Sequence, residues 1–479
     1  MTQLNGNYIG GQWVPAHSGA SFERHNPART DEVVSVAPDS AEGDVAQAVE
    51  YVADHCHQWA ETAPDLRADV LNRAADILAR QADSLAVELV REEGKTLAEA
   101  RMETSRTPQN LRFYAGEALR LNGENYPTGD GSLVFTVRQP VGVVAAITPW
   151  NFPLNIPSRK LGPALAAGNG VVFKPSEVTP LAGQRLVEAL LEAGVPGGAL
   201  SLVHGHAEVG KALVTHPRVD AVTFTGSTSV GESIHRSVRT SVRCQLEMGG
   251  KNALVVLADS DLDKAAAIIA KGAFSLSGQA CTGTSRVVVH ESVADALLDR
   301  VMERAQALVL GNGLDEGVTT GPLATTAQLD KYHSYLQVGL ADGAVLETPL
   351  SGSDANGGLF ARPTIFTSVK PMARIAQEEI FSPILAFLTV SSYDEAVEVV
   401  NGTQFGLSAG IVTSDIATAI RFTRDAQVGL VKVNQSTNGM AMNAPFGGMR
   451  SSSTQTFKEQ AGASMMQFYT QDKTAYFSL

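Results

Sequence analysis

The chain has 479 residues, more than one ordinary hydrophobic core accommodates, so we expect two or three domains. Its 44% hydrophobic and 18% charged residues are typical of a globular protein, and the net charge of −13 argues against nucleic acids and anionic membranes as partners. No N-terminal stretch combines basic residues with an apolar run, and no apolar run approaches the ~20 residues of a membrane span. The expected location is the cytoplasm.

The first part of the chain is predicted to be mainly helical. The opening "MTQLNGNYIGGQWV" indicates short strands around a Gly-Gly turn. Residues 41–117 carry apolar side chains at spacings of three and four, which is typical of amphipathic helices. Residues 124–140 break this pattern with a Gly-Asp-Gly turn between two strand-like pieces.

From residue 141 short apolar strands alternate with helices. The strands "VGVVAAIT", "GVVFK", "ALSLVHG", "VDAVTFTG" and "RCQLEM" are separated by helical segments, the first of them at 155–167. A second series runs from "NALVVLA" at 252–258 through "SRVVVH", "PILAFLTV" and "LSAGIVTS" to "GLVKVN" at 429–434. This alternation predicts two α/β domains with parallel sheets covered on both faces. The alternating tail 465–479 predicts one further strand.

Three polar motifs follow strands of the first series, where open α/β sheets bind their ligands. "FTGSTSVG" places Gly226 and Gly231 at the start of a helix, whose free N–H groups favour phosphate, although a tight turn without a ligand explains it nearly as well. In "FKPSE", Lys174 and Glu177 are placed for ribose hydroxyls or phosphate, and a solvated charged loop is the alternative. In "TPWNFPL", Asn151 is either an oxyanion donor or the cap of the next helix.

Two further motifs carry candidate reactive groups. Glu247 stands at a strand end in "LEMGGKN", where a carboxylate is a candidate general base and a surface charge or salt-bridge partner is the alternative. Cys281 lies in "GQACTGTSR" among glycines and small hydroxyl residues, where a packed core would carry Leu or Val. The other two cysteines, Cys56 and Cys244, are interpreted as packing residues, and the three together form neither a disulfide framework nor a CxxC zinc motif.

Together and in this order, these motifs resemble those of the aldehyde dehydrogenase superfamily over nearly the whole chain. The resemblance implies an α/β fold with a Rossmann-type cofactor domain, an α/β catalytic domain and a small β oligomerisation hairpin. Seven motifs match in order, with Met248 in place of the Leu of E-L-G-G-K and Ser382 in place of the Gly of EEIFGP. The motifs are TPWNFP, K-P-x-E, FTGSxxxG, E-L-G-G-K, G-Q-x-C, EEIFGP and the pocket loop "APFGG", and their positions here are Asn151; Lys174 and Glu177; Gly226, Ser227 and Gly231; Glu247; Cys281; Glu379 and Phe381; and 444–448.

The resemblance also implies where the domains begin and end. The cofactor-binding domain is assigned to residues 1–123 and 141–250, and the catalytic domain to 251–434. The hairpin at 124–140 joins the C-terminal segment 435–479 as the oligomerisation element. Because unpaired edge strands of this kind invite pairing with a second chain, we expect a homodimer or homotetramer.

The resemblance implies that Cys281 is the nucleophile, which agrees with the high nucleophilicity of a thiolate. Its attack on an aldehyde gives a thiohemiacetal, whose oxyanion the Asn151 amide and the Cys281 backbone N–H would hold. Hydride transfer to NAD(P)+ leaves a thioester, which Glu247 hydrolyses to the acid through a water molecule. Lys160 is assigned the role of raising the positive potential nearby.

The expected cofactor is NAD, with measurable use of NADP, and no metal is expected. Glu177 suits the hydroxyls of the adenosine ribose and would repel the extra phosphate of NADP, whereas Lys174 and Ser176 are the residues that could hold that phosphate. The residues assigned to the cofactor are Thr148, Pro149, Trp150, Lys174, Ser176, Glu177, Gly226, Ser227, Gly231, Glu379 and Phe381.

The substrate prediction rests on Arg159, eight residues after Asn151 and therefore about two turns further along if both lie on one helix. A guanidinium suits a carboxylate, and a salt bridge to a neighbouring helix is the alternative. The C-terminal segment resembles members that oxidise α-ketoglutarate semialdehyde, and both hints favour a short ω-oxo acid. Phe152 and Phe446 are expected to line the same tunnel, which leaves an aromatic or broad-specificity aldehyde dehydrogenase as the alternative.

Two related classes of protein compete with a hydrolytic dehydrogenase. A CoA-acylating enzyme would use the same cysteine without a hydrolytic glutamate, and a catalytically silent structural homologue would need neither residue. Both Cys281 and Glu247 are present, which favours the aldehyde dehydrogenase.

Overall fold

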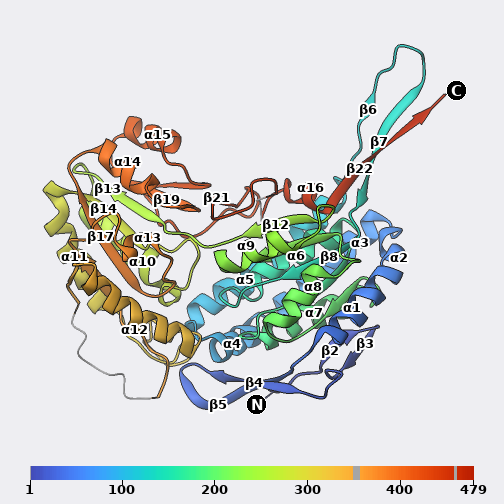
Figure 1. The fold of residues 1–479 in the computed structure, drawn as a ribbon, viewed down its shortest axis with the longest axis horizontal. Coiled ribbons are helices and arrows are strands. Elements are labelled where there is room, and N and C mark those ends of the chain that lie inside the picture. The colour runs from blue at the N-terminus through green and yellow to red at the C-terminus, as the bar shows by residue number, and fades with distance from the viewer. Residues whose placement is uncertain (1, 349–356, 458–460, 479) are drawn as a thin grey trace.

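A seven-stranded sheet forms the centre of the first half of the molecule (Figure 1). The computed structural model describes residues 2–348, 357–457 and 461–478. Five of the strands are parallel, and an N-terminal hairpin turning at Gly10 and Gly11 adds two antiparallel strands at one edge. In sheet order the strands are β12 (Arg243–Glu247), β11 (Ala221–Thr225), β8 (Val143–Ile147), β9 (Gly170–Lys174), β10 (Leu200–Leu202), β2 (Asn7–Ile9) and β3 (Gln12–Val14).

Helices cover both faces of this sheet because successive strand residues face opposite sides. Val143 and Ala145 of β8 pack with α1, α8 and α9, whereas Val144 and Ala146 pack with α3 to α7. The helices are α1 (Glu42–His55), α2 (His57–Ala60), α3 (Pro64–Arg80), α4 (Ala82–Glu93), α5 (Leu97–Ala118), α6 (Asn155–Ala166), α7 (Pro180–Glu192), α8 (Ala207–Thr215) and α9 (Thr228–Ser237).

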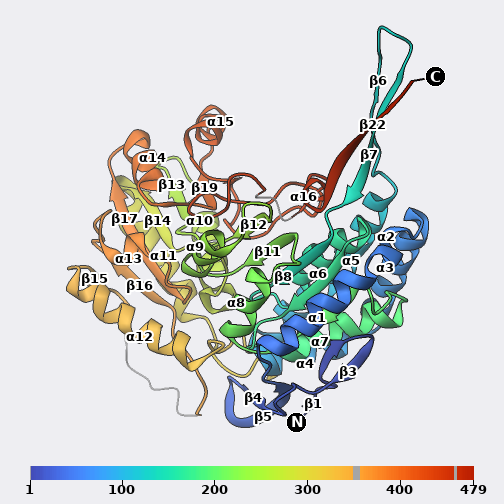
Figure 2. The same ribbon diagram turned by 45° about the vertical axis from the view of Figure 1, so that its right-hand side comes forward.

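A second seven-stranded sheet forms the centre of the other half and is parallel except for its edge strand β15 (Figure 2). The strands, in sheet order, are β15 (Val345–Leu346), β16 (Thr364–Thr367), β17 (Ile384–Val390), β14 (Arg286–His290), β13 (Ala253–Val256), β19 (Ser408–Val412) and β20 (Leu430–Val433). One face is covered by α10 (Leu262–Phe274) and α11 (Ala294–Gln306), and the other by α12 (Thr326–Ala341), α13 (Arg374–Gln377), α14 (Tyr393–Asn401) and α15 (Ile416–Asp425). The predicted α/β fold class is therefore confirmed.

A three-stranded sheet projects from the body as an arm (Figures 1 and 2). It consists of β6 (Asn125–Tyr126), β7 (Leu133–Pro140) and β22 (Thr470–Phe477), and β22 pairs with β7 over its whole length. The prediction of a single strand over 465–479 is wrong in its first part, because Met465–Tyr469 forms the helix α16. Its buried Met465, Met466, Phe468 and Tyr469 follow helical spacing rather than alternation.

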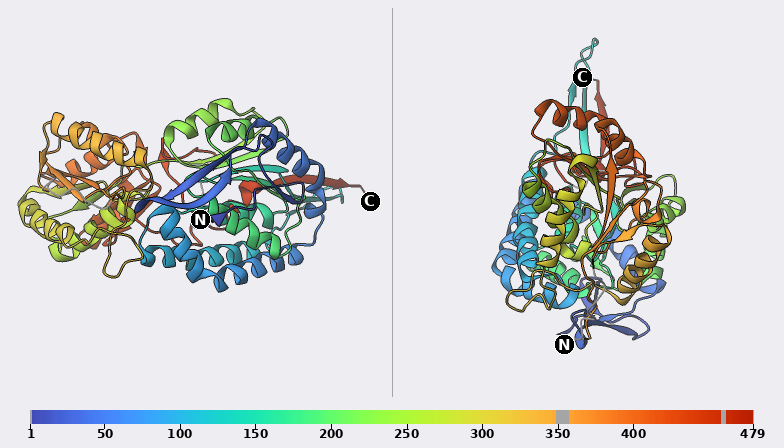
Figure 3. Two further views of the ribbon diagram at one scale, coloured as in Figure 1. Left: turned by 90° about the horizontal axis from the view of Figure 1, so that it is seen from below. Right: turned by 90° about the vertical axis from the view of Figure 1, so that its left-hand side faces the viewer.

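The N-terminal residues form a second small sheet at the end of the molecule opposite the arm (Figure 3). It contains β1 (Thr2–Gln3), β5 (Arg29–Pro38) and β4 (Ser21–Asn26). β1 lies in the N-terminal stretch that was predicted to form short strands, whereas no element was predicted at β4 or β5. Among the described helices, none is both long and apolar enough to span a membrane.

Candidate active site

Asn151 lies in the loop between β8 and α6 and reaches across to the second half of the molecule. Its side chain is 2% exposed, and its Nδ2 donates a hydrogen bond to the Gln279 carbonyl, 3.0 Å away. Helix α6 begins at Asn155, after Leu154, and has no side-chain cap, so the interpretation of Asn151 as a helix cap is wrong. An amide nitrogen has two hydrogens, and the bond to Gln279 uses one of them.

Cys281 follows the short 3-10 helix Ser275–Gly278 and precedes β14. Leu276 and Ser277 adopt left-handed φ angles of 53° and 54°, which L-residues adopt only when the surrounding structure holds them. The Asn252 Nδ2 donates to the carbonyls of Cys281 and Gly283, at 2.8 and 2.9 Å. The loop that presents the thiol is therefore fixed from β13.

The half-buried Cys281 thiol packs against Leu407, Phe446 and Ala461. Burial, together with the carboxylate of Glu379, raises the pKa of this thiol to about 12, although the positive charge of Arg159 opposes the shift. The thiol is thus protonated at neutral pH, and the positive charge of Arg159 favours the thiolate form.

Glu247 is the last residue of β12 and is 1% exposed, so the alternative of a surface charge is wrong. Ser453 Oγ donates to Glu247 Oε1 at 2.6 Å, and the Gly448 N–H donates to Oε2 at 3.3 Å. The backbones of Glu247 and Ser453 also form an antiparallel bridge. The C-terminal segment therefore holds the carboxylate of the candidate base.

Lys160 is fully buried on α6, and its Nζ donates to Thr223 Oγ1 at 2.8 Å. Thr223 in turn donates to Gln245 Oε1, also at 2.8 Å. Burial lowers the pKa of Lys160 to about 7, although the negative charge of Glu247 opposes that shift. The amine therefore lies within electrostatic range of the candidate base and titrates near neutral pH.

Arg159 lies on α6 and is 6% exposed. Its guanidinium contacts Met440 Sδ, and its Cζ lies 5.8 Å from the centroid of the Phe446 ring. The predicted two-turn spacing from Asn151 is wrong, because Asn151 precedes the helix. Among residues 2–348, 357–457 and 461–478, Arg159 forms no ion pair within 4.0 Å, so the salt-bridge alternative finds no support there.

The "FKPSE" residues follow β9 at the carboxyl edge of the first sheet. Lys174 is 4% exposed, and its Nζ donates to the Pro175 carbonyl at 3.0 Å and lies 3.5 Å from Glu177 Oε2. The Glu177 side chain is 41% exposed, and the Ser176 hydroxyl accepts a bond from the Val178 N–H at 3.2 Å. A buried lysine beside an exposed carboxylate is compatible with a ligand at this edge.

The "FTGSTSVG" residues lead from β11 into α9. Ser227 caps the helix by accepting a bond from the Val230 N–H at 3.4 Å. A Cβ on Gly231 would lie 2.4 Å from Met248 Sδ, so the glycine allows α9 to pack on the end of β12. Thr148 Oγ1 and Thr228 Oγ1 are buried and have no hydrogen-bond partner among the described residues. These two hydroxyls are available to a bound polar molecule.

Glu379 and Phe381 come from the second half and lie beside the Cys281 segment. The Gly250 N–H donates to Glu379 Oε1 at 3.1 Å, and a Cβ on Gly249 would lie 2.0 Å from Oε2, so Gly249 leaves room for this carboxylate. Phe381 has a left-handed φ of 61°, and the Trp150 ring meets it edge-on at 5.5 Å. A small cavity is lined by Gly250, Gly278, Ala280, Glu379, Phe381 and Ser382 among others.

Comparison with known proteins assigns the chain to a family. The sequence profile of the aldehyde dehydrogenase family matches residues 13–475, and the chain belongs to that family. It is 39% identical to the alpha-ketoglutarate semialdehyde dehydrogenase of Haloferax volcanii over 100% of both chains. It is 39% identical to the alpha-ketoglutaric semialdehyde dehydrogenase of Bacillus subtilis over 98% of this chain and 97% of that one. The structure of an NAD-dependent aldehyde dehydrogenase from Sinorhizobium meliloti superimposes with a TM-score of 0.96 at 35% identity, covering 100% of this chain and 95% of that one.

Several residues of the site did not emerge from the sequence. Asn252 and Ser453 hold the Cys281 loop and the Glu247 carboxylate, and Met440 contacts Arg159. Asn252 directly follows "LEMGGK", so its proximity to that motif was an available signal. Met440 and Ser453 lie in the C-terminal segment, where no local motif marks either residue.

Proposed function

We propose that this protein oxidises an aldehyde to the carboxylic acid, with NAD as the hydride acceptor. The observation that carries the proposal is the bond between Asn151 and Gln279, because it ties the candidate oxyanion amide to the segment that presents the Cys281 thiol. A preorganised amide donor of this kind stabilises a developing oxyanion. The buried Glu247 carboxylate supplies the base for hydrolysis.

Each residue has one task in the proposed reaction. The Cys281 thiol gives its proton to solvent, with the thiolate favoured by Arg159, and Sγ forms a bond to the aldehyde carbon while the carbonyl π pair moves to oxygen. The free hydrogen of the Asn151 amide and the Cys281 N–H hold the resulting oxyanion of the thiohemiacetal, which becomes a thioester when its carbon loses hydride to NAD. Glu247 then takes a proton from the water that attacks the thioester, Cys281 leaves as the thiolate, and Lys160 supports the local positive potential.

The residues of the first sheet edge fit a dinucleotide. The unpartnered hydroxyls of Thr148 and Thr228 are buried at this edge, and the N-terminus of α9 follows Gly226 directly. Bound NAD supplies the nicotinamide ring that accepts the hydride. The similar Sinorhizobium meliloti protein is described as NAD-dependent, which supports this assignment. Among the described residues, no group of three His, Cys, Asp or Glu side chains is arranged to hold a metal ion.

NAD is the preferred cofactor in this proposal, with measurable use of NADP. The partly exposed Glu177 carboxylate suits ribose hydroxyls and disfavours a 2′-phosphate, while the buried Lys174 amine beside it lowers that discrimination. We expect a higher kcat/KM with NAD than with NADP for the same aldehyde. A kcat/KM strongly in favour of NADP would contradict the assignment of Glu177.

The proposed substrate is a short ω-oxo acid, a semialdehyde with a distal carboxylate. Arg159 is buried beside Phe446, which also packs against the thiol of Cys281, so the guanidinium lies near the reacting group. Two similar proteins are named as dehydrogenases of α-ketoglutarate semialdehyde. The Phe446 ring is the observation that favours the second candidate, an aromatic or broad-specificity aldehyde dehydrogenase.

The experiment compares kcat/KM for succinate semialdehyde, α-ketoglutarate semialdehyde, butanal and benzaldehyde, in the wild type and in Arg159→Leu. Loss of a charge-assisted bond is expected to cost the two acids ~1.5–3 kcal/mol, at least tenfold, beyond the loss seen with butanal, which measures only the weaker support of the Cys281 thiolate. Arg159→Lys, which keeps the charge but not the forked donor, should fall between the two. A wild type that prefers benzaldehyde, or an Arg159→Leu variant that loses all four substrates equally, would refute the carboxylate role.

We also propose a role for each part of the chain. Residues 1–123 and 141–250 contain the first sheet and are assigned to cofactor binding, and residues 251–434 contain the second sheet and are assigned to catalysis. The arm at 124–140, with the segment 435–479, is assigned to the assembly of a homodimer or homotetramer.

A further inference from the structure

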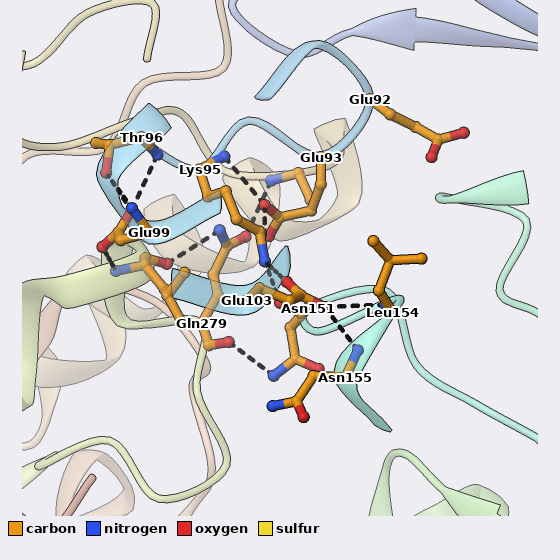
Figure 4. A network of polar contacts seen from close by, with 12 residues as sticks. Glu92, Glu93, Lys95, Thr96, Glu99, Glu103, Asn151, Leu154, Asn155 and Gln279 are labelled. Atoms are coloured by element: carbon orange, nitrogen blue, oxygen red, sulfur yellow. Dashed lines mark hydrogen bonds and ion pairs between the residues drawn. The ribbon is translucent and has the colours of Figure 1, made fainter. Parts of the chain in front are cut away.

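A cluster of charged side chains is buried behind the Asn151 loop (Figure 4). The side chains of Lys95 and Glu103 are 0% exposed, and Lys95 Nζ lies 2.5 Å from Glu103 Oε2. The Glu93 side chain is 1% exposed, with Oε2 3.8 Å from the same amine. Lysine and glutamate are rarely buried this completely, because removing a charge from water is costly even when it is paired. The cluster lies beside the candidate active site, and a role in the reaction would explain why such costly buried charges are present.

The Lys95 amine holds the backbone of the loop that carries the oxyanion donor. Its Nζ donates to the Asn151 carbonyl at 2.8 Å and lies 4.9 Å from the centroid of the Phe152 ring. On the other side, the Asn151 amide is fixed by its bond to the Gln279 carbonyl. The backbone of Asn151 is therefore held from one direction and its side chain from another.

Glu103 holds the next part of the same segment. Its Oε1 accepts bonds from the N–H groups of Leu154 and Asn155, at 2.9 and 3.0 Å. These groups lie at the N-terminus of α6, where backbone donors lack partners within the helix and a negative charge is favourable. Because Leu154 provides no side-chain cap, the Glu103 carboxylate takes that place, and its second oxygen pairs with Lys95.

The first turn of α5 also reaches the segment that leads to the nucleophile. Glu99 Oε1 accepts a bond from the Leu276 N–H at 2.7 Å, and Gln279 Nε2 donates to the Leu276 carbonyl at 3.2 Å. Helix α5 therefore contacts both the segment that follows the oxyanion donor and the left-handed residues before Cys281.

The Lys95 amine carries a charge in these surroundings. Burial by itself would lower the pKa of Lys95, but the carboxylates of Glu103 and Glu93 outweigh burial and raise it. A charged ammonium directs its donors to Glu103 and to the Asn151 carbonyl at the same time, and charge-assisted bonds of this type are the stronger ones.

We propose that Lys95 and Glu103 are positioning residues for the oxidation of the aldehyde. Their ion pair fixes the position of the Asn151 backbone, and thereby the orientation of the side-chain amide that holds the oxyanion. Both side chains are inaccessible to solvent, so they act through Asn151 and not by touching the substrate. This inference rests on the proposed role of Asn151, and its test separates the two.

The test is a double-mutant cycle between Lys95→Met and Asn151→Ala, read as the single-turnover rate of NADH formation. Removal of one oxyanion donor costs about 10²–10³-fold, and a misplaced one costs on the order of 10²-fold. We expect Lys95→Met to slow hydride transfer by about 10²-fold with KM and NAD affinity nearly unchanged. In the Asn151→Ala background, Lys95→Met should add less than about twofold, since independent effects multiply and shared ones do not.

If Lys95→Met does not fold, Glu103→Gln tests the role of the Lys95–Glu103 ion pair in its place. Glutamine retains an oxygen for Leu154 and Asn155 but loses the charge that pairs with Lys95. The matched control is Glu92→Gln, because Glu92 caps α7 in the same way, accepting bonds from Leu181 and Ala182 at 2.7 and 2.9 Å, and α7 carries no residue of the site. Glu92→Gln should keep the wild-type rate within about twofold.

Alkylation of Cys281 by iodoacetamide completes the test, because that reaction has no oxyanion to stabilise. We expect Glu103→Gln to slow hydride transfer while alkylation stays at the wild-type rate. Wild-type hydride transfer in both Lys95→Met and Glu103→Gln overturns the inference, and so does a loss that multiplies with that of Asn151→Ala. Full activity of Asn151→Ala itself overturns the proposed oxyanion role instead.

Discussion

The Ser453 hydroxyl donates a hydrogen bond to Glu247 Oε1, 2.6 Å away, across 206 residues of sequence. Both side chains are buried, and the Gly448 N–H donates to the second oxygen of the same carboxylate. Hydrogen bonds from the C-terminal segment, and not the strand that carries Glu247, therefore set the orientation of the candidate base. Variation in that segment would change the hydrolysis step without altering the residues that attack the aldehyde.

Ser453→Ala should slow steady-state turnover roughly tenfold, since a hydrogen bond to a charged group contributes about 1.5–3 kcal/mol. The pre-steady-state burst of NADH should keep its rate, because Glu247 acts after hydride transfer in the proposed reaction. The matched control is Ser452→Ala, because the Ser452 hydroxyl accepts a bond from the Gly406 N–H, whereas the Ser453 hydroxyl donates to Glu247. Equal losses in the two variants would show that Ser453 has only a structural role.

Glu247→Gln should complete one round of hydride transfer and then stall. A glutamine keeps an oxygen for Ser453 but cannot take a proton from water, so the thioester accumulates. Stopped-flow absorbance at 340 nm should show a burst of about one equivalent of NADH per site, followed by a very slow steady state. If the burst disappears as well, Glu247 activates the Cys281 thiol instead.

The reactivity of Cys281 in the free protein should rise with pH well beyond the usual range. Burial, together with Glu379, holds the pKa of this thiol near 12, so the thiolate fraction grows about tenfold per pH unit from pH 7 to pH 10 without a plateau. Arg159→Leu removes the charge that lowers this pKa and should slow alkylation by iodoacetamide at every pH. Cys281→Ala measures the background from Cys56 and Cys244. A plateau below pH 9 would contradict this assignment.

The strands of the first sheet and five of the seven strands of the second were predictable because their apolar residues follow the period of buried strands, whereas β15 and β16 were not predicted. The residues that position the chemistry were not, because contacts such as Lys95 with Asn151, 56 positions apart, leave no local pattern. The two errors have local causes. The helical spacing of Arg159 from Asn151 failed because a loop intervenes, and α16 was taken for a strand because its five residues were grouped with the strand residues 470–477 that follow.

Lys160 should make stability depend on pH above neutrality. Burial lowers the pKa of this lysine from 10.5 to about 7, so between these values the unfolded chain binds more protons than the folded one. The free energy of unfolding contributed by Lys160 therefore rises with pH across that window. Urea denaturation at pH 7, 8.5 and 10 should show that Lys160→Met lacks this rise relative to the wild type. Lys211→Met, at a lysine with a 70% exposed side chain, should follow the wild type.

The arm should mediate self-association. Strand β22 forms one edge of its sheet, and Tyr476 and Phe477 on that strand are 77% and 49% exposed, which is unusual for aromatic side chains at an unpaired edge. Phe477 also stacks on Phe135 of β7 at 5.6 Å, so both strands offer apolar surface to a partner chain. We expect the wild type to elute as a dimer or tetramer in size-exclusion chromatography with light scattering.

Tyr476→Ser combined with Phe477→Ser should shift the protein toward smaller species, because the substitutions remove apolar surface that a partner strand would cover. Ile416→Ser on α15 is the matched control, since Ile416 is 71% exposed on the body of the molecule and away from the arm. Circular dichroism should show the same fold for all three proteins. A monomeric wild type, or an assembly that the arm variant leaves intact at micromolar concentration, would show that this surface does not hold the chains together.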